Sequence, residues 1–231
     1  NNYRTASGSP GHEYWQQRAD YDINCYLDEE KLNLKGTETI TYYNNSPDEL
    51  EYLWLQLDEN EQSSTKNANY QMGTFLPEKT TTNRVEITQL PEKDNGYGVN
   101  IEKVVDAHGK PLPYTINKTM MRIDLPKKLK KGEVFKFKID WNYNIPDRML
   151  MGGRGGYEYF KEDGNHLFTI TQWYPRMCVY SDFKGWQHQQ FTGRGEFALT
   201  FGNFKVSMNV PADHIVASTG ECKNYEQVLT S

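Results

Sequence analysis

The histidines and glutamates are the first candidates for chemistry, because together they bind metals and activate water. A zinc peptidase helix needs two histidines four residues apart, with a glutamate beside the first as general base. The nearest string is His-Glu-Tyr-Trp-Gln at 12–16, where glutamine stands in place of the second histidine. The other histidines, at positions 108, 166, 188 and 214, are isolated in the sequence. We therefore predict no metal-binding and no catalytic residue in this chain.

Two runs carry residue types that bind anions in other proteins. The glycine-rich run at 152–156 lacks the Lys-Ser/Thr end and the following helix of a phosphate-binding loop. The lysine-rich run at 127–132 lies between two expected strands, where its charges most simply solvate the end of a hairpin. We favour a flexible loop at the first run and a hairpin end at the second over anion sites.

Single carboxylates and thiols are scattered along the chain. Asp163, Asp182 and Glu196 are of the type that glycoside hydrolases use in pairs, but the sequence does not give their separation. Surface carboxylates are common, so we do not favour this chemistry. The three cysteines are odd in number and widely spaced, which fits neither a disulfide framework nor a metal knuckle. At most one disulfide can join two of Cys25, Cys178 and Cys222.

The most unusual stretch is Thr-Gln-Trp-Tyr-Pro-Arg at 171–176, followed by Trp186 and Gln187. Large aromatic and amide side chains gathered beside a proline turn often form recognition surfaces. The alternative is that Trp173 and Tyr174 close the hydrophobic core at a strand end, as aromatic residues commonly do. Taken alone, the residues favour core closure over recognition.

Composition limits the classes of protein to which the chain can belong. With 231 residues it is long for one domain, yet all-β sandwiches often reach this size. The net charge is −5 and both signs are interspersed, which favours neither nucleic acid nor an anionic membrane. No apolar run is long enough to span a bilayer. The first residue is Asn1, so we expect a processed terminus.

The elements that must position these residues are strands. Phe135, Phe137, Ile139, Trp141 and Tyr143 alternate with polar residues, as a strand with one buried face requires. Residues 21–27 and 32–42 alternate in the same way around a turn at 28–31, which predicts an opening hairpin. After a turn at 44–48, residues 52–57 fit a strand that is covered on both faces.

Further strands are expected along the rest of the chain, separated by turn residues. We place them at 84–90, 97–105, 119–125, 167–173, 195–201, 203–210 and 213–218. Residues 59–71 are polar and suit a short helix or a loop. The whole reads as an all-β saddle or sandwich of about ten antiparallel strands with little helix. We expect a flexible terminus at 1–13 and a single β domain at 14–231.

Three segments in this order resemble the amino-terminal domain of the gluzincin aminopeptidases, the group that contains aminopeptidase N and leukotriene hydrolase. They are YWQQRADYDINCYLDEEKLNLKGTETITYYNNSPDELEYLWLQLDEN at 14–60, TQWYPRMCVYSDFKGW at 171–186 and GRGEFALTFGNFKVSMNVPADHIVASTGE at 193–221. Each segment alone is moderately specific, but their ordered combination spans nearly the whole chain. The similarity is greatest to a bacterial-type branch of that group.

The resemblance implies a saddle-shaped β domain that packs on a thermolysin-like catalytic domain. In that family the catalytic domain carries the His-Glu-x-x-His zinc helix and a Gly-x-Met-Glu-Asn substrate strand, and neither motif occurs here. We expect zinc only in that missing domain and no catalysis by this chain alone. The family continues its β domain beyond a TGE-like segment, so we expect Ser231 to fall short of the natural boundary. A periplasmic or extracellular location is also expected.

The family's β domain contributes a Thr-Gln-x-Glu/Gln loop that holds the substrate's free α-ammonium group. By this resemblance Gln172 matches the loop's first polar residue, and Tyr174 takes the place of the binding carboxylate or amide. A phenol binds an ammonium less well than a carboxylate does, although its ring contributes cation–π attraction. Such an anchor favours peptides with a free amino terminus.

Two other functions remain open at this point. The chain can be a stand-alone β-sandwich module that binds sugars or peptides through Trp173, Tyr174 and Trp186. The parent can also be a family member that has lost catalysis and serves as a scaffold. Neither alternative requires a metal in this chain.

Overall fold

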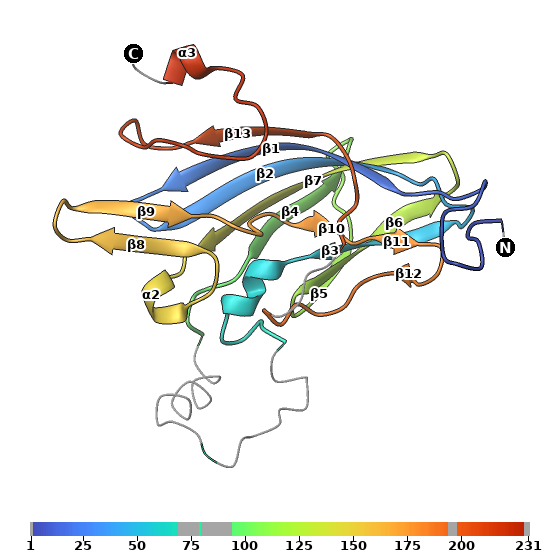
Figure 1. Cartoon of the computed structure of the whole chain (residues 1–231), viewed down its shortest axis with the longest axis horizontal. Coiled ribbons are helices and arrows are strands. Elements are labelled where there is room, and N and C mark those ends of the chain that lie inside the picture. The colour runs from blue at the N-terminus through green and yellow to red at the C-terminus, as the bar shows by residue number, and fades with distance from the viewer. Residues whose placement is uncertain (1, 69–78, 80–93, 194–197, 229–231) are drawn as a thin grey trace.

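A computed structural model describes residues 2–68, 79, 94–193 and 198–228 (Figure 1). The expected all-β class is confirmed, because strands dominate and the helices are single turns. The strands are β1 (Arg18–Asp28), β2 (Asn33–Tyr43), β3 (Leu50–Gln56), β4 (Asn100–Asp106), β5 (Tyr114–Asn117), β6 (Met120–Leu129), β7 (Val134–Asn144), β8 (Gly156–Phe160), β9 (Asn165–Thr169), β10 (Arg176–Met177), β11 (Tyr180–Ser181), β12 (Gly185–Trp186) and β13 (Phe204–Asn209). The short helices are the 3-10 helix η1 (Asp58–Gln62), α2 (Arg148–Met151) and α3 (Tyr225–Val228).

Two sheets enclose one hydrophobic cluster. A five-stranded sheet has the order β13-β1-β2-β7-β4, and a four-stranded sheet has the order β10-β3-β6-β5. Buried side chains from both sheets form the cluster between them, with Ile23, Leu53, Met121 and Ile139 all fully buried. The hairpins β8-β9 and β11-β12 form two further small sheets.

The opening hairpin is confirmed. β1 and β2 pair antiparallel over their whole length, from Arg18 opposite Tyr43 to Asp28 opposite Asn33. Along β2 every second residue is buried, as an alternating strand over a core requires. At one of these core positions Gly36 faces Trp141 across the β2-β7 pair. A Cβ there would lie 2.2 Å from the indole Cζ2, so this close packing requires glycine.

Strand β7 also matches its prediction, and the ends of β4, β6 and β13 lie within four residues of the predicted ends. Of the two faces predicted for residues 52–57, Leu53 and Leu55 are fully buried while Tyr52 and Trp54 are half-buried. The expected strand at 84–90 lies outside the described residues, as does the first half of that at 195–201. The strand expected at 213–218 is not present.

Two connections differ from the sequence-based expectation. β13 pairs with β1 in parallel, from Phe204 opposite Tyr21 to Asn209 opposite Tyr26, although all pairs were expected to be antiparallel. The lysine-rich run at 127–132 does not end a hairpin, because β6 and β7 belong to different sheets. It crosses between the sheets, and Lys127, Lys128 and Lys130 pair there with glutamates.

The amino-terminal segment turns back on itself beside the β11-β12 hairpin. Arg4 donates two hydrogen bonds to Asp182, at 2.7 and 2.8 Å. Gly11 N donates to Tyr3 O at 2.8 Å, which closes the turn. The expected mobility of residues 1–13 stays a prediction. Within the described part of the chain, no helix is long and apolar enough to cross a membrane.

Candidate functional site

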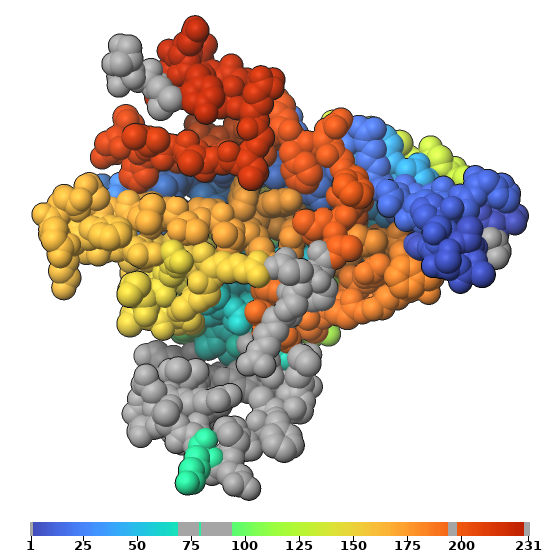
Figure 2. All heavy atoms as spheres, in the orientation of Figure 1, coloured from blue at the N-terminus to red at the C-terminus, as the bar shows by residue number. Residues whose placement is uncertain are grey.

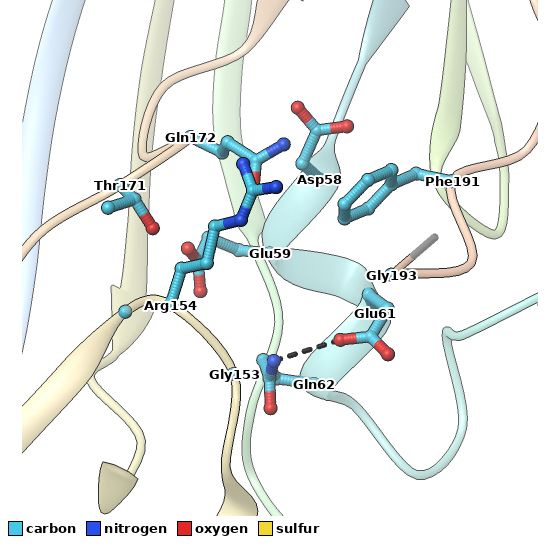
Figure 3. A pocket seen from close by; sticks show the side chains of 11 residues that line it. Asp58, Glu59, Glu61, Gln62, Gly153, Arg154, Thr171, Gln172, Phe191 and Gly193 are labelled. Carbon is cyan, nitrogen blue, oxygen red and sulfur yellow. Dashed lines mark hydrogen bonds between the residues drawn. The ribbon is translucent and has the colours of Figure 1, made fainter. Parts of the chain in front are cut away.

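A small cavity of about 80 Å³ opens beside η1, and we call it the acidic pocket (Figure 3). Three carboxyl groups and one arginine line the pocket. Its lining comes from η1, the glycine-rich loop, the 171–172 turn and the segment before β13. The lining residues are Asp58, Glu59, Glu61, Gln62, Gly153, Arg154, Gly155, Thr171, Gln172, Phe191 and Gly193.

The 3-10 helix η1 places the three carboxyl groups within little more than one turn. Asp58 is buried and forms an ion pair with Arg176, whose side chain is 11% exposed. Glu61 accepts a hydrogen bond from Gln62 Nε2 at 2.8 Å. Asn60, between them, points the other way and fixes the turn by donating to Lys118 O at 2.7 Å. The helix is thus held by its buried side while its acidic side faces the cavity.

The carboxyl group of Glu59 binds its proton more tightly than an ordinary glutamate does. Burial, followed by the nearby charges of Asp58 and Glu61, raises the pKa of Glu59 to about 8. Removing an anion from water and placing it beside other anions both disfavour its charged form. At neutral pH this carboxyl therefore holds a proton, and a cation in the pocket would favour its release.

Gln172 forms the wall of the pocket opposite η1. Its backbone φ is 52°, in the left-handed region that residues other than glycine, asparagine and aspartate seldom occupy. Such a conformation costs on the order of 1 kcal/mol or more and persists only where the surroundings impose it. In Figure 3 the Gln172 amide points into the pocket, toward Asp58 and the guanidinium of Arg154.

Two glycine-bearing segments allow the close approach of the walls. Gly193 has a φ of 71°, and a Cβ there would lie 2.9 Å from Glu61 Oε1. The glycine-rich run follows α2 and brings Gly153, Arg154 and Gly155 to the cavity. The predicted loop is therefore present at 152–155, while Gly156 begins β8. In Figure 3 the Arg154 side chain reaches across the pocket between Gln172 and Glu59.

Tyr174, the second residue that the family resemblance assigned to substrate binding, does not line the acidic pocket. It lines a separate cavity of about 210 Å³ with Tyr21, Arg176 and Phe204. Its ring packs edge-on against Tyr21, with ring centroids 5.5 Å apart. Burial raises the pKa of Tyr174 to about 12. The structure therefore does not bring Gln172 and Tyr174 together in one cavity.

The aromatic residues that the module hypothesis requires do not form one exposed platform. Trp186 is only 8% exposed and stacks against Tyr42, with centroids 6.1 Å apart. Trp173 is half-buried and packs on Trp141 at 5.8 Å. With Tyr174 facing Tyr21, each ring meets a different part of the core. These rings close the hydrophobic core, which was the alternative considered from the sequence.

The other sequence candidates are dispersed. Asp182 is paired with Arg4, far along the chain from Asp163, which lies in the β8-β9 turn. Glu196 is outside the described residues. Cys25 and Cys178 are buried and Cys222 is exposed, and all three thiols are free.

Sequence reasoning missed the carboxylates of the pocket. Residues 59–71 were expected to form a polar helix or loop, and the first residues of that stretch do form η1. The available signal was the acidic string Asp-Glu-Asn-Glu at 58–61, which puts three carboxylates into little more than one turn. The chain has no zinc-binding helix motif, so its residues do not fit the zinc that the resemblance implies for a catalytic domain.

Comparison with known proteins finds solved structures but no sequence relatives. No family model matches the chain, and no curated protein matches it. It is similar to an M1 zinc metallopeptidase from Deinococcus radiodurans at 12% identity and a TM-score of 0.43, over 93% of this chain and 38% of that one. The Deinococcus enzyme bound to a Tyr-Ser-Ala substrate gives 13% identity and a TM-score of 0.42. A two-domain M1 zinc metallopeptidase bound to L-tryptophan gives 12% and 0.42. This chain spans 38% to 39% of the length of these proteins.

Proposed function

We propose that this chain is the non-catalytic amino-terminal domain of a zinc-dependent aminopeptidase, and that its acidic pocket binds the substrate's free amino terminus. The observation that carries the proposal is the convergence of three η1 carboxylates with the Gln172 amide on one cavity. Gln172 belongs to the Thr-Gln segment on which the family resemblance rests. Hydrolysis itself is assigned to a domain outside this chain.

The size and charge of the pocket suit an ammonium group. A cavity of about 80 Å³ accommodates an amino group with one or two waters, but not a large side chain. Hydrogen bonds between an ammonium and a carboxylate are stronger than neutral ones, and an amide oxygen can accept a further hydrogen bond. An internal peptide bond carries no charge there, so the pocket favours a terminal residue.

The proposal also requires a surface against which the catalytic domain packs. Helix α2 carries Met149 and Leu150, which are 77% and 82% exposed. The glycine-rich loop that lines the acidic pocket follows α2 directly. Exposed apolar side chains in a contiguous group mark interaction sites. A domain that covers α2 would therefore also close the mouth of the acidic pocket.

The test uses the isolated chain and a small amine. L-alaninamide should bind with a Kd in the millimolar range, because the catalytic domain, which would supply the rest of the substrate site, is absent from the assay. N-acetyl-L-alaninamide, which lacks the charge, should not bind. Amide signals of residues 58–62, 153–155 and 171–172 should shift in two-dimensional NMR spectra. Equal shifts with the acetylated compound, or shifts confined to other segments, would contradict the proposal.

Protonation supplies a second measurement. Because the pKa of Glu59 is about 8, binding of an ammonium at pH 7 should release close to one proton. The heat of binding should then depend on the ionisation enthalpy of the buffer. Affinity should rise with pH toward 8 and fall above it as the amine loses its own proton. Glu59→Gln should abolish the buffer dependence, whereas the exposed control Glu162→Gln should retain it.

A further inference from the structure

A cluster of histidine and carboxylate side chains lies at the far end of the five-stranded sheet from the amino-terminal turn. Its members come from three separate segments: the β1-β2 turn, the β8-β9 hairpin and the loop after β13 (Figure 1). In Figure 2 the segment after β13 lies directly against the β8-β9 hairpin. The four side chains are those of Glu29, His166, Asp213 and His214.

The two oxygens of Glu29 face different imidazole rings. Oε1 lies 3.0 Å from Nδ1 of His166, within hydrogen-bond distance. Oε2 lies 3.8 Å from Nε2 of His214, which is too far for a hydrogen bond. His166 and His214 are mostly buried, with side chains 22% and 18% exposed. The carboxylate is thus oriented by one ring while its second oxygen faces the other.

One ring nitrogen of His214 has a hydrogen-bond partner and the other has none. Nδ1 lies 3.2 Å from Asp213 Oδ1. A carboxylate accepts hydrogen bonds, so Nδ1 carries the proton and, in the neutral ring, Nε2 presents its lone pair. This Nε2 is buried and has no hydrogen-bond partner. Two electron-rich atoms, Nε2 of His214 and Oε2 of Glu29, therefore face each other across 3.8 Å.

A metal ion resolves this arrangement. Zinc binds imidazole nitrogen and carboxylate oxygen at about 2.1 Å, so an ion midway between atoms 3.8 Å apart makes a coordination angle of about 130°. Ligand atoms of Glu29, Asp213 and His214 all lie within 4.8 Å of one another. Metal-binding histidines typically donate their second nitrogen to a carboxylate, and metal-binding carboxylates are themselves hydrogen-bonded. Here Asp213 lies at hydrogen-bond distance from Nδ1 of His214, and His166 lies at hydrogen-bond distance from Glu29.

The surroundings strengthen such a site. The ring of Phe168 packs near both histidines, with its centroid 5.6 Å from that of His166 and 5.8 Å from that of His214. The ring centroid of Tyr159 lies 4.9 Å from that of His166. Apolar walls exclude water and increase the attraction between a cation and its ligands. Nitrogen and oxygen donors together select zinc and neighbouring transition metals over magnesium.

We propose that Glu29 and His214 bind a divalent transition-metal ion, with Asp213 and His166 orienting them. The ion joins the β1-β2 turn to the loop after β13, and the hydrogen bond between His166 and Glu29 adds the β8-β9 hairpin. The role is structural, because the two ligands come from segments far apart in the chain. The expectation of no metal-binding residue rested on spacing in the sequence, which does not register residues that meet only in the fold.

The test is metal binding by the chain produced without a histidine tag and freed of metal with a chelator. Titration with zinc should show one site with a Kd on the order of micromolar. Cobalt should bind at the same site and give visible absorption bands. The Tm should rise by about 5 °C or more when zinc exceeds the Kd a hundredfold.

Matched variants separate this site from adventitious binding. Asp213→Asn keeps the exposed position and its shape but weakens the orienting hydrogen bond, so affinity should fall about 10- to 100-fold. His214→Ala should abolish binding, and Glu29→Gln should weaken it strongly. His108→Ala removes an exposed histidine elsewhere and should change nothing. Absence of zinc binding, or equal binding by Asp213→Asn, His214→Ala and the unmodified chain, would overturn the proposal, whatever the result of amine titration.

Discussion

Glu38 should make the stability of this protein depend on pH, because it is buried in the hydrophobic core without a partner. It occupies a core position of β2, between Gly36 and Ile40 in the strand's alternation. Its neighbours across the sheet are Ile23 on β1 and Ile139 on β7. The side chain is fully buried, and neither carboxyl oxygen has a hydrogen-bond partner.

Burial raises the pKa of Glu38 well above its ordinary value of 4.5. In the unfolded chain the carboxyl ionises near that ordinary value, whereas in the folded protein it stays protonated to higher pH. The unfolded state therefore holds fewer protons above pH 4.5. The contribution of Glu38 to stability is fully present below that pH and is lost as pH rises toward the raised pKa.

The size of the effect follows from the linkage relation. Each pH unit in this window lowers the free energy of unfolding by about 1.4 kcal/mol for one proton. Over two pH units within this window the loss is therefore about 2 to 3 kcal/mol. For a protein of 231 residues, that corresponds to a fall in Tm of about 5 to 10 °C.

The assay is urea unfolding of the wild-type protein and Glu38→Gln at several pH values across this range. Glutamine has a similar shape and does not titrate, so the wild type should lose about 2 to 3 kcal/mol more than the variant. Glu59 and all other titrating groups are present in both proteins and cancel in the difference. Glu162→Gln, an exposed change in the β8-β9 turn, should follow the wild type. Parallel stability curves for wild type and Glu38→Gln would refute the reasoning.

Two further predictions concern the core and the thiols. Gly36→Ala should lower the free energy of unfolding by about 1 to 3 kcal/mol, measured by urea denaturation, because its Cβ would lie 2.2 Å from the indole of Trp141. An unchanged midpoint would contradict that contact. A thiol reagent at pH 8 should modify only Cys222 in the native protein and all three cysteines after unfolding, as counted by mass spectrometry. Burial raises the pKa of Cys25 to about 11 and also that of Cys178, so native labelling of either would be inconsistent with the core.

The sequence predicted strands best where one face packs on the core. In β7, Phe137, Ile139, Trp141 and Tyr143 are all buried, because a period of two in a strand maps directly onto the two sides of a sheet. The same rule marks Glu38 as a carboxyl at a core position, a signal that was available in the alternation of β2. Local alternation therefore predicted the fold class, but Glu38 was not identified from it.

Pairing between distant segments was not predictable in this way. The parallel pair of β1 and β13 joins residues far apart in the chain, and alternation gives no information on strand direction. The acidic pocket combines η1, the glycine-rich loop and Gln172, which are separated by long stretches of sequence. His166 and His214 are isolated in the sequence for the same reason. Sites built from several segments require the fold before their members can be identified.

The 171–176 stretch places rings that close the core next to a residue that lines the acidic pocket. Trp173 packs on Trp141 and Tyr174 packs on Tyr21, so both rings are held by the core. The residue before them, Gln172, has a left-handed backbone that needs such fixed neighbours to persist. The rings therefore act as anchors, and the turn that they impose directs the amide into the acidic pocket. Under the proposed function, Tyr174 would then act through the backbone of Gln172 and not by contact with the amine, in keeping with the different cavities that the two residues line.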